Sequence, residues 1–296
     1  MISVKRKIIF TLFITLFFSY SVSAAELSRE LTYEELKPKE GWKAVTDGVE
    51  LKGVALRRQN WYGMGLTKED FKGESINIDE IQKVNIKALR IDLKKLKLRL
   101  IYCWDFGEKN GADIKTLVKK SGAIGAVTGG FYDYGKDLKS FKPVGILIVD
   151  GQKIGKWMAG ANGILIVNSG GSADIIEKGK YKYSPDIIHA VQSGPILVDD
   201  GEIKIDKPLS FNEFKILPRT AIGITKDKKI IMVAGETEYN GLSLYELAEV
   251  MKRLESDKAL NMDGGPSAQM YLTTKKTELY VKGVGKIIDA IGVFQK

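Results

Sequence analysis

The chain has 296 residues, of which 44% are hydrophobic, and its formal net charge is +9. This composition supports a packed core and excludes an intrinsically disordered chain. A single cysteine, Cys103, and a single histidine, His189, exclude a disulfide framework, a Cys-rich metal site and any site that needs two imidazoles from one chain.

The first 24 residues have the three parts of a secretory signal peptide. A basic segment at residues 5–7 precedes an apolar run at residues 8–18, and Val22-Ser23-Ala24 is a small-residue cleavage pattern. An uncleaved membrane anchor is the alternative, but the run is shorter than the ~20 residues that a bilayer span needs. We therefore expect cleavage after Ala24, a secreted or periplasmic protein, and no stable membrane insertion after cleavage.

Residues 25–296 are predicted to form a single domain. Short apolar or alternating segments between glycine turns predict strands at 85–92, 96–102, 124–127, 144–149, 164–167, 196–198, 220–225, 229–234, 259–262, 268–272, 278–281 and 287–294. One short helix is predicted at 113–120, ending near Gly122. A second helix begins at the capping box Ser243–Glu246 and is expected to end near Ser256. The fold class is therefore α+β, a β-rich domain of mixed or antiparallel sheet with a few helices.

The charge pattern of the domain indicates a lysine-coated surface. Lysines are scattered and interleaved with acidic residues, without a basic stripe that carries regular aromatics. We expect no nucleic-acid partner. The sequence does not indicate an oligomeric state.

One generic catalytic motif is nearly matched. Gly265-Pro266-Ser267-Ala268-Gln269 resembles the G-x-S-x-G nucleophile elbow, but glutamine replaces the last glycine. A serine hydrolase that uses Ser267 and His189 is therefore one alternative. It requires the two side chains to lie within hydrogen-bond reach of each other.

Four glycine-containing segments place polar or charged residues at the end of an apolar run. They are residues 126–133, 191–195, 218–223 and 260–267. Glycine at a strand end allows close backbone approach to a ligand. Each segment alone is compatible with an ordinary tight turn, but four of them in one chain indicate a shared binding site.

The same segments resemble motifs of the phosphodiester glycosidase family. The resemblance runs from about residue 124 to the C-terminus and is weaker before it. Its motifs are Thr128–Tyr132 (with Thr128 where the family has Asn), Arg219–Gly223, Thr237-Glu238, Gly241–Ala248 and Asn261–Ser267 (with Met262 for Leu and Pro266 for Gly).

This resemblance implies hydrolysis of a sugar-1-phosphodiester, in a glycan or envelope polymer, at the anomeric C–O bond. Because phosphate is a weakly basic leaving group, the reaction mainly needs a carboxylate near the anomeric carbon, a cation for the phosphate and donors for sugar hydroxyls. The candidate catalytic residues are Asp263 and Glu238. Arg219 suits the phosphate because its planar fork matches phosphate oxygens. The other candidate substrate-binding residues are Thr128, Gly129, Gly130, Ser193, Gly194, Thr220, Gly264, Gly265 and Ser267.

Each of these assignments has a structural alternative. Arg219 could pair with a buried acid, Asp263 could cap its own turn, and Glu238 could be an exposed loop residue. Spacing leaves open which carboxylate is acid, base or nucleophile. A non-catalytic glycan-binding or polysaccharide-assembly protein on the same fold is a further alternative. A glycosidase requires Arg219, Asp263 and Ser193 to converge on one cleft, whereas a binding module should show an open groove with exposed aromatic residues.

No cofactor and no essential metal are expected. One histidine and one cysteine leave only oxygen-rich metal sites, and the sequence contains no Asp-rich calcium loop.

Overall fold

Antiparallel pairing joins all neighbouring strands in the part of the chain that the computed structural model describes. The described residues are 33–35, 41–58, 83–134, 141–206, 217–236 and 241–296. Three sheets and one small hairpin hold these strands. The β-rich, antiparallel architecture predicted from the sequence is confirmed.

The first sheet has the order β1-β3-β4-β17-β16-β18-β14-β15, with β2 beside β3. Its strands are β1 (Tyr33–Glu35), β2 (Lys43–Thr46), β3 (Val49–Arg58), β4 (Lys83–Ile91), β14 (Ile196–Asp199), β15 (Glu202–Ile203), β16 (Thr220–Thr225), β17 (Ile230–Glu236) and β18 (Ser256–Asn261).

The second sheet has the order β20-β19-β6-β21-β5. Its strands are β5 (Leu96–Tyr102), β6 (Gly125–Thr128), β19 (Met270–Thr273), β20 (Glu278–Val281) and β21 (Asp289–Gln295).

The third sheet has the order β10-β9-β13-β11-β12, and β7 pairs with β8 separately. These strands are β7 (Tyr132–Asp133), β8 (Lys142–Pro143), β9 (Leu147–Val149), β10 (Gln152–Lys153), β11 (Gly163–Asn168), β12 (Ala173–Glu177) and β13 (Ile187–Ser193).

Two α-helices lie within the described residues, α4 (Ile114–Ser121) and α6 (Leu244–Arg253), with short 3-10 turns at η3 (Cys103–Phe106), η4 (Lys178–Lys180) and η5 (Gly265–Ser267). The capping box of α6 is formed as predicted, because Ser243 accepts from the Glu246 N–H and Glu246 accepts from the Ser243 N–H. The predicted end near Ser256 is wrong. The chain turns at Glu255, whose φ is 66°, and Ser256 already pairs in β18.

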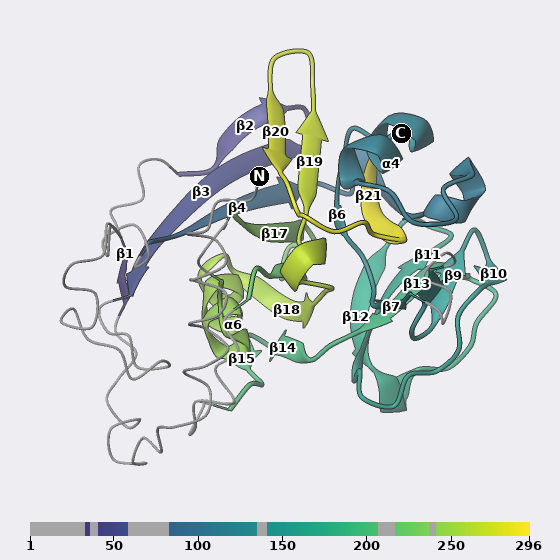
Figure 1. The fold of residues 1–296 in the computed structure, drawn as a ribbon. Helices are drawn as coiled ribbons and strands as arrows, with labels where there is room; N and C mark the ends of the chain where they lie inside the picture. Colours follow the sequence, from purple (N-terminus) through teal and green to yellow (C-terminus); the bar gives the residue numbers. More distant parts are fainter. Residues whose placement is uncertain (1–32, 36–40, 59–82, 135–140, 207–216, 237–240) are drawn as a thin grey trace, which may run out of the picture.

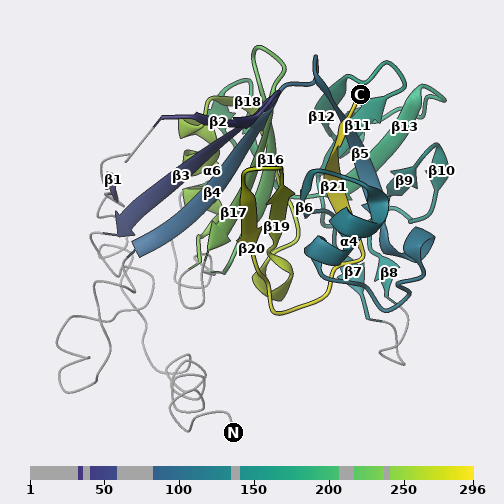
Figure 2. The ribbon, with the colours of Figure 1, turned by 90° about the horizontal axis from the view of Figure 1, so that it is seen from above.

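The three sheets pack around a shared core. The second sheet lies between the first and the third (Figures 1 and 2). Helix α6 packs on β14 and β18, and α4 packs on β6 and β19. One large apolar cluster joins the sheets, and a second lies between α6 and the first sheet. No helix in the described ranges is long and apolar enough to cross a membrane. The predicted signal peptide, residues 1–24, lies outside the described residues.

Candidate active site

The segment after β18 is the point where the four glycine-containing segments meet. Ser193 Oγ donates to the Asn261 carbonyl, and Asn261 Nδ2 donates to the Gly194 carbonyl, both at 2.7 Å. The Asp263 N–H donates to the Gly129 carbonyl at 3.0 Å. Strands of all three sheets therefore end at this segment, β18 from the first, β6 from the second and β13 from the third.

The fourth segment joins through β16. Thr220 Oγ1 donates to the Asp263 carbonyl at 2.5 Å, and the Gly265 N–H donates to the Pro218 carbonyl at 2.7 Å. Arg219, between these two anchors, lies beside Gly264: a Cβ atom on Gly264 would be 3.8 Å from Arg219 Cδ. The structure therefore joins the chain segments that carry Arg219, Asp263 and Ser193. The Ser193 hydroxyl is buried against Asn261, so convergence of the three side chains on one cleft stays a prediction.

Three candidate substrate-binding hydroxyl groups face the protein interior. Thr128, Ser193 and Thr220 are fully buried. The Thr128 hydroxyl donates to the Ser267 carbonyl at 2.6 Å, and the other two donate to Asn261 and Asp263 as described above. The structure therefore does not support Ser193 and Thr220 as donors to phosphate or sugar oxygens. Their protons already stabilise the junction between the sheets.

The glycines of the junction allow close packing of the chain. The predicted backbone donors all donate within the protein: Gly129, Gly130, Gly264 and Gly265. A Cβ atom on Gly129 would lie 1.7 Å from Asp289 Oδ1, and one on Gly264 would lie 2.8 Å from the Pro218 carbonyl oxygen. Glycine is needed here because backbone and side chains approach each other, so the expected backbone cradle for a ligand is not open in this structure.

Asp263 is a mostly buried carboxyl group in the junction. Its Oδ1 accepts from the Gly264 N–H at 2.9 Å, which is the turn-capping contact expected of aspartate. Burial raises the pKa of Asp263 to about 6, while hydrogen bonds from Ser267 and the Gly264 N–H oppose the shift. Desolvation outweighs the two hydrogen bonds, so Asp263 holds its proton to a higher pH than an exposed aspartate does.

A second buried carboxyl group, Asp289, was missed from the sequence. It begins β21 and is only 1% exposed. Its Oδ1 accepts from the Gly130 N–H at 2.7 Å, and its Oδ2 is buried without a hydrogen-bond partner. Burial raises the pKa of Asp289 to about 7, and the negative charge of Asp263 contributes in the same direction. The available signal was a lone acid within the apolar run at 287–294.

Arg219 supplies a cation to the same junction. Its Nε donates to the Leu242 carbonyl at 3.0 Å. Burial lowers the pKa of Arg219 to about 10, and the nearby Glu246 carboxylate partly offsets this. The guanidinium therefore stays protonated at neutral pH. The alternative role for Arg219 was to pair with a buried acid. Glu246, the capping-box acid of α6, is such an acid.

Aromatic side chains adjoin the junction. Tyr132 Oη donates to the Lys286 carbonyl at 2.5 Å and lies 3.4 Å from Ser267 Oγ. The Tyr132 ring stacks on Phe141 at 5.3 Å, and the exposed Tyr134 contacts both rings edge-on. Burial raises the pKa of Tyr132, so its hydroxyl remains protonated.

Ser267 and His189 do not form a catalytic pair. His189 is buried in β13, where its Nδ1 accepts from the Asp150 N–H at 3.2 Å and its Nε2 lies 3.6 Å from Asp150 Oδ1. Burial lowers the pKa of His189 to about 4. Ser267 instead contacts Tyr132 and Asp263. The serine-hydrolase alternative is therefore not supported.

Two predicted residues, Thr237 and Glu238, lie outside the described residues. Among the residues that are described, no group of three His, Cys, Asp or Glu side chains is arranged to hold a metal ion. Independence from metals and cofactors stays a prediction.

Comparisons with known proteins agree with the motifs. The family model for phosphodiester glycosidases matches residues 121–294. The chain is similar to bovine N-acetylglucosamine-1-phosphodiester alpha-N-acetylglucosaminidase, at 30% identity over 94 residues, which are 29% of this chain and 18% of that enzyme. It is 30% identical over 156 residues to the Escherichia coli protein YigE, covering 50% of this chain and 57% of YigE. The chain thus matches under a fifth of the length of the bovine enzyme.

Solved structures share the fold. The zebrafish N-acetylglucosamine-1-phosphodiester alpha-N-acetylglucosaminidase catalytic domain, auto-inhibited by its pro-peptide, aligns with a TM-score of 0.61 at 14% identity, covering 90% of this chain and 88% of that one. A Burkholderia pseudomallei protein described as exported aligns with a TM-score of 0.57 at 15% identity, covering 72% and 74%. The junction of the three sheets lies within the family-matched residues.

Proposed function

Because the chain belongs to the phosphodiester glycosidase family, we propose that it is an exported hydrolase that cleaves the anomeric C–O bond of a sugar-1-phosphodiester. One observation carries the proposal. A buried carboxyl group, a partly buried one whose charge acts on it, and a protonated arginine belong to the same junction of the three sheets, within residues 121–294. Titratable groups whose pKa values are strongly shifted by burial and by one another are concentrated at functional sites.

The two carboxyl groups have different roles in the proposed reaction. Burial raises the pKa values of both groups. Asp289 is the more deeply buried of the two, so we assign the proton of the singly protonated pair to Asp289 and the charge to Asp263. The Asp263 carboxylate opposes the positive charge that develops at the anomeric carbon. A neutral Asp289 avoids a second buried negative charge, which would repel the phosphodiester.

Arg219 has the complementary role toward the leaving group. Its guanidinium binds the phosphate oxygens, which gain charge as the C–O bond breaks. Water supplies the oxygen that bonds to the anomeric carbon, and the phosphate leaves with the electron pair of the broken bond. Because the released phosphate is a weak base, its departure needs little help from a general acid. The site therefore needs no histidine.

The test is direct hydrolysis. The purified protein is incubated with a panel of sugar-1-phosphodiesters, including N-acetylglucosamine-1-phosphodiesters, and the released sugar is measured. We expect turnover of at least one compound by the wild type and by Asp206→Asn, a change at an exposed aspartate. We expect none from Asp263→Asn. Binding of a sugar-1-phosphodiester without hydrolysis of any panel member would instead support the non-catalytic glycan-binding alternative.

A further inference from the structure

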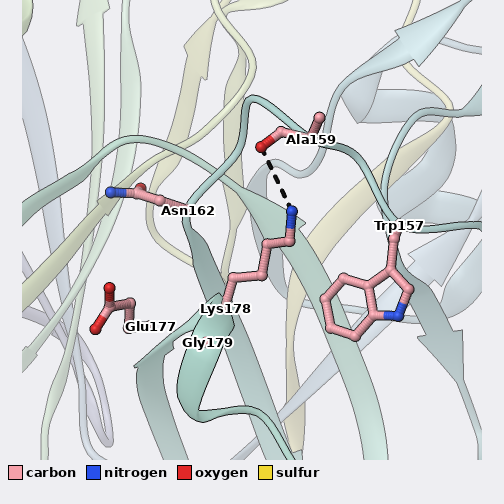
Figure 3. A pocket seen from close by; sticks show the side chains of 6 residues that line it. All are labelled: Trp157, Ala159, Asn162, Glu177, Lys178 and Gly179. Carbon is pink, nitrogen blue, oxygen red and sulfur yellow. Dashed lines mark hydrogen bonds between the residues drawn. The ribbon is translucent and has the colours of Figure 1, made fainter.

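A pocket on the third sheet has no role in the proposed reaction. Its volume is about 460 Å³, within the range of about 300–1,000 Å³ that is typical of small-molecule sites. The β10–β11 connection forms one side, and the end of β12 with η4 forms the other. The lining residues are Trp157, Ala159, Asn162, Glu177, Lys178 and Gly179 (Figure 3).

Trp157 is an exposed aromatic side chain that is nevertheless held in place. The residue is 46% exposed. Tyr181 packs edge-on against it at 5.3 Å, and the Lys178 ammonium lies 5.9 Å from the ring centroid. An ordered indole at the rim of a pocket offers apolar surface to a ligand at little cost in conformational entropy.

Asn162 and Glu177 lie on one side of Lys178, and Trp157 lies on the other (Figure 3). Asn162 Oδ1 accepts from the Ile196 N–H at 2.8 Å, which fixes the amide. No described residue accepts a hydrogen bond from Asn162 Nδ2, so both N–H donors of the amide are available. Lys178 Nζ donates to the carbonyls of Met158 at 2.8 Å and Ala159 at 3.4 Å, and it retains a third proton.

The pocket carries charges of both signs and is not a purely cationic site. Glu177 precedes Lys178 in the chain, and its Oε2 also lies 3.6 Å from Lys180 Nζ. Glu177 adds hydrogen-bond acceptors to the donors of Asn162 and Lys178. A neutral group with several hydroxyls and one apolar face matches these donors and acceptors and the Trp157 ring. A phosphate would be repelled by the Glu177 carboxylate.

We propose that this pocket binds a neutral sugar unit, with its apolar face against Trp157 and its hydroxyls toward Asn162, Lys178 and Glu177. One lining residue, Asn162, packs against a segment of the junction. A Cβ atom on Gly194 would lie 3.0 Å from the Asn162 backbone nitrogen, and the Gly194 carbonyl accepts from Asn261 Nδ2. The pocket would hold a sugar of the same polymer whose phosphodiester reaches Asp263. This last role rests on the proposed function, but sugar binding does not.

The test measures binding by the full chain rather than turnover. Calorimetric titration uses two soluble probes, a tetramer of N-acetylglucosamine and a tetramer of glucose. We expect the wild type to bind at least one probe, and Trp157→Ala to weaken that binding about tenfold or more. Tyr183→Ala is the matched control, because Tyr183 is 72% exposed and does not line the pocket. Its affinity is expected to equal that of the wild type.

Two further variants keep the proposal falsifiable. Asn162→Asp retains an acceptor for the Ile196 N–H but loses both donors, so it is expected to weaken binding even if Trp157→Ala misfolds. Asp206→Asn, at an exposed position outside the pocket, is expected to bind as the wild type does. If the wild type binds a probe but hydrolyses no sugar-1-phosphodiester, the sugar site stands and the proposed function falls. Unchanged binding by folded Trp157→Ala and Asn162→Asp, or no binding of either probe by the wild type, overturns the proposal.

Discussion

Replacing Asp289 with asparagine is expected to make the free energy of unfolding less dependent on pH. Asparagine can still accept from the Gly130 N–H, and it places an uncharged group where Oδ2 is buried without a partner. In the wild type, the ordinary pKa of 3.8 is raised to about 7 by burial. Between these two values the folded protein binds a proton that the unfolded chain releases. Stability is therefore lost as the pH rises through this window.

The size of the effect follows from the two pKa values. One carboxyl group that shifts from 3.8 to about 7 lowers the free energy of unfolding by roughly 2–3 kcal/mol between pH 5 and pH 8. Asp289→Asn removes this loss. We therefore expect the stability of the variant relative to the wild type to be roughly 2–3 kcal/mol more favourable at pH 8 than at pH 5.

The assay is urea unfolding, followed by tryptophan fluorescence, for both proteins at both pH values. Effects of the substitution that do not depend on pH cancel when the two differences are subtracted. Asp206→Asn, at an exposed position, is the control and is expected to show the same difference from the wild type at both pH values. An Asp289→Asn difference that is equal at pH 5 and pH 8 would refute the assignment of Asp289 as a carboxyl group that is neutral near pH 6.

The other predictions concern activity. Asp263→Asn is expected to lower kcat and kcat/KM together by about 100-fold or more on a sugar-1-phosphodiester, and near-normal turnover by a folded variant would leave Asp263 as a turn cap only. Arg219→Lys is expected to harm phosphodiester substrates more than an aryl glycoside of the same sugar, because the aryl group offers no phosphate to the guanidinium; equal losses on both would remove the phosphate role. Plotted against pH, kcat/KM is expected to rise as Asp263 ionises near pH 6 and to fall as Asp289 ionises near pH 7, with the alkaline fall absent in Asp289→Asn. Activity is expected to survive chelation, and restoration of lost activity by one divalent ion would contradict this.

Local patterns in the sequence predicted much of the fold. The alternation from Leu96 to Tyr102 is a strand whose polar members, Lys97 and Arg99, are exposed. The capping box at Ser243 starts a helix because both of its hydrogen bonds are local. The end of that helix was misplaced because pairing with β16 draws Ser256 into β18, and this contact is distant in the sequence.

The candidate site was only partly predictable. The motifs indicated which segments converge, because their composition marks strand ends beside glycine. They could not indicate that the Thr128 and Ser193 hydroxyls face inward, since their acceptors belong to other strands. The Trp157 pocket carries no motif or periodicity, and it arises only when the β10–β11 connection lies against η4.

At position 289, an aspartate is less favourable for folding than an asparagine would be. A buried oxygen without a partner and a carboxyl group whose burial raises its pKa both cost folding free energy at neutral pH. Asparagine would make the same hydrogen bond to Gly130 without a charge. Packing alone therefore does not explain a carboxyl group at the start of β21. The proposed reaction would explain it, because a proton held on Asp289 would leave one negative charge, that of Asp263, near the anomeric carbon.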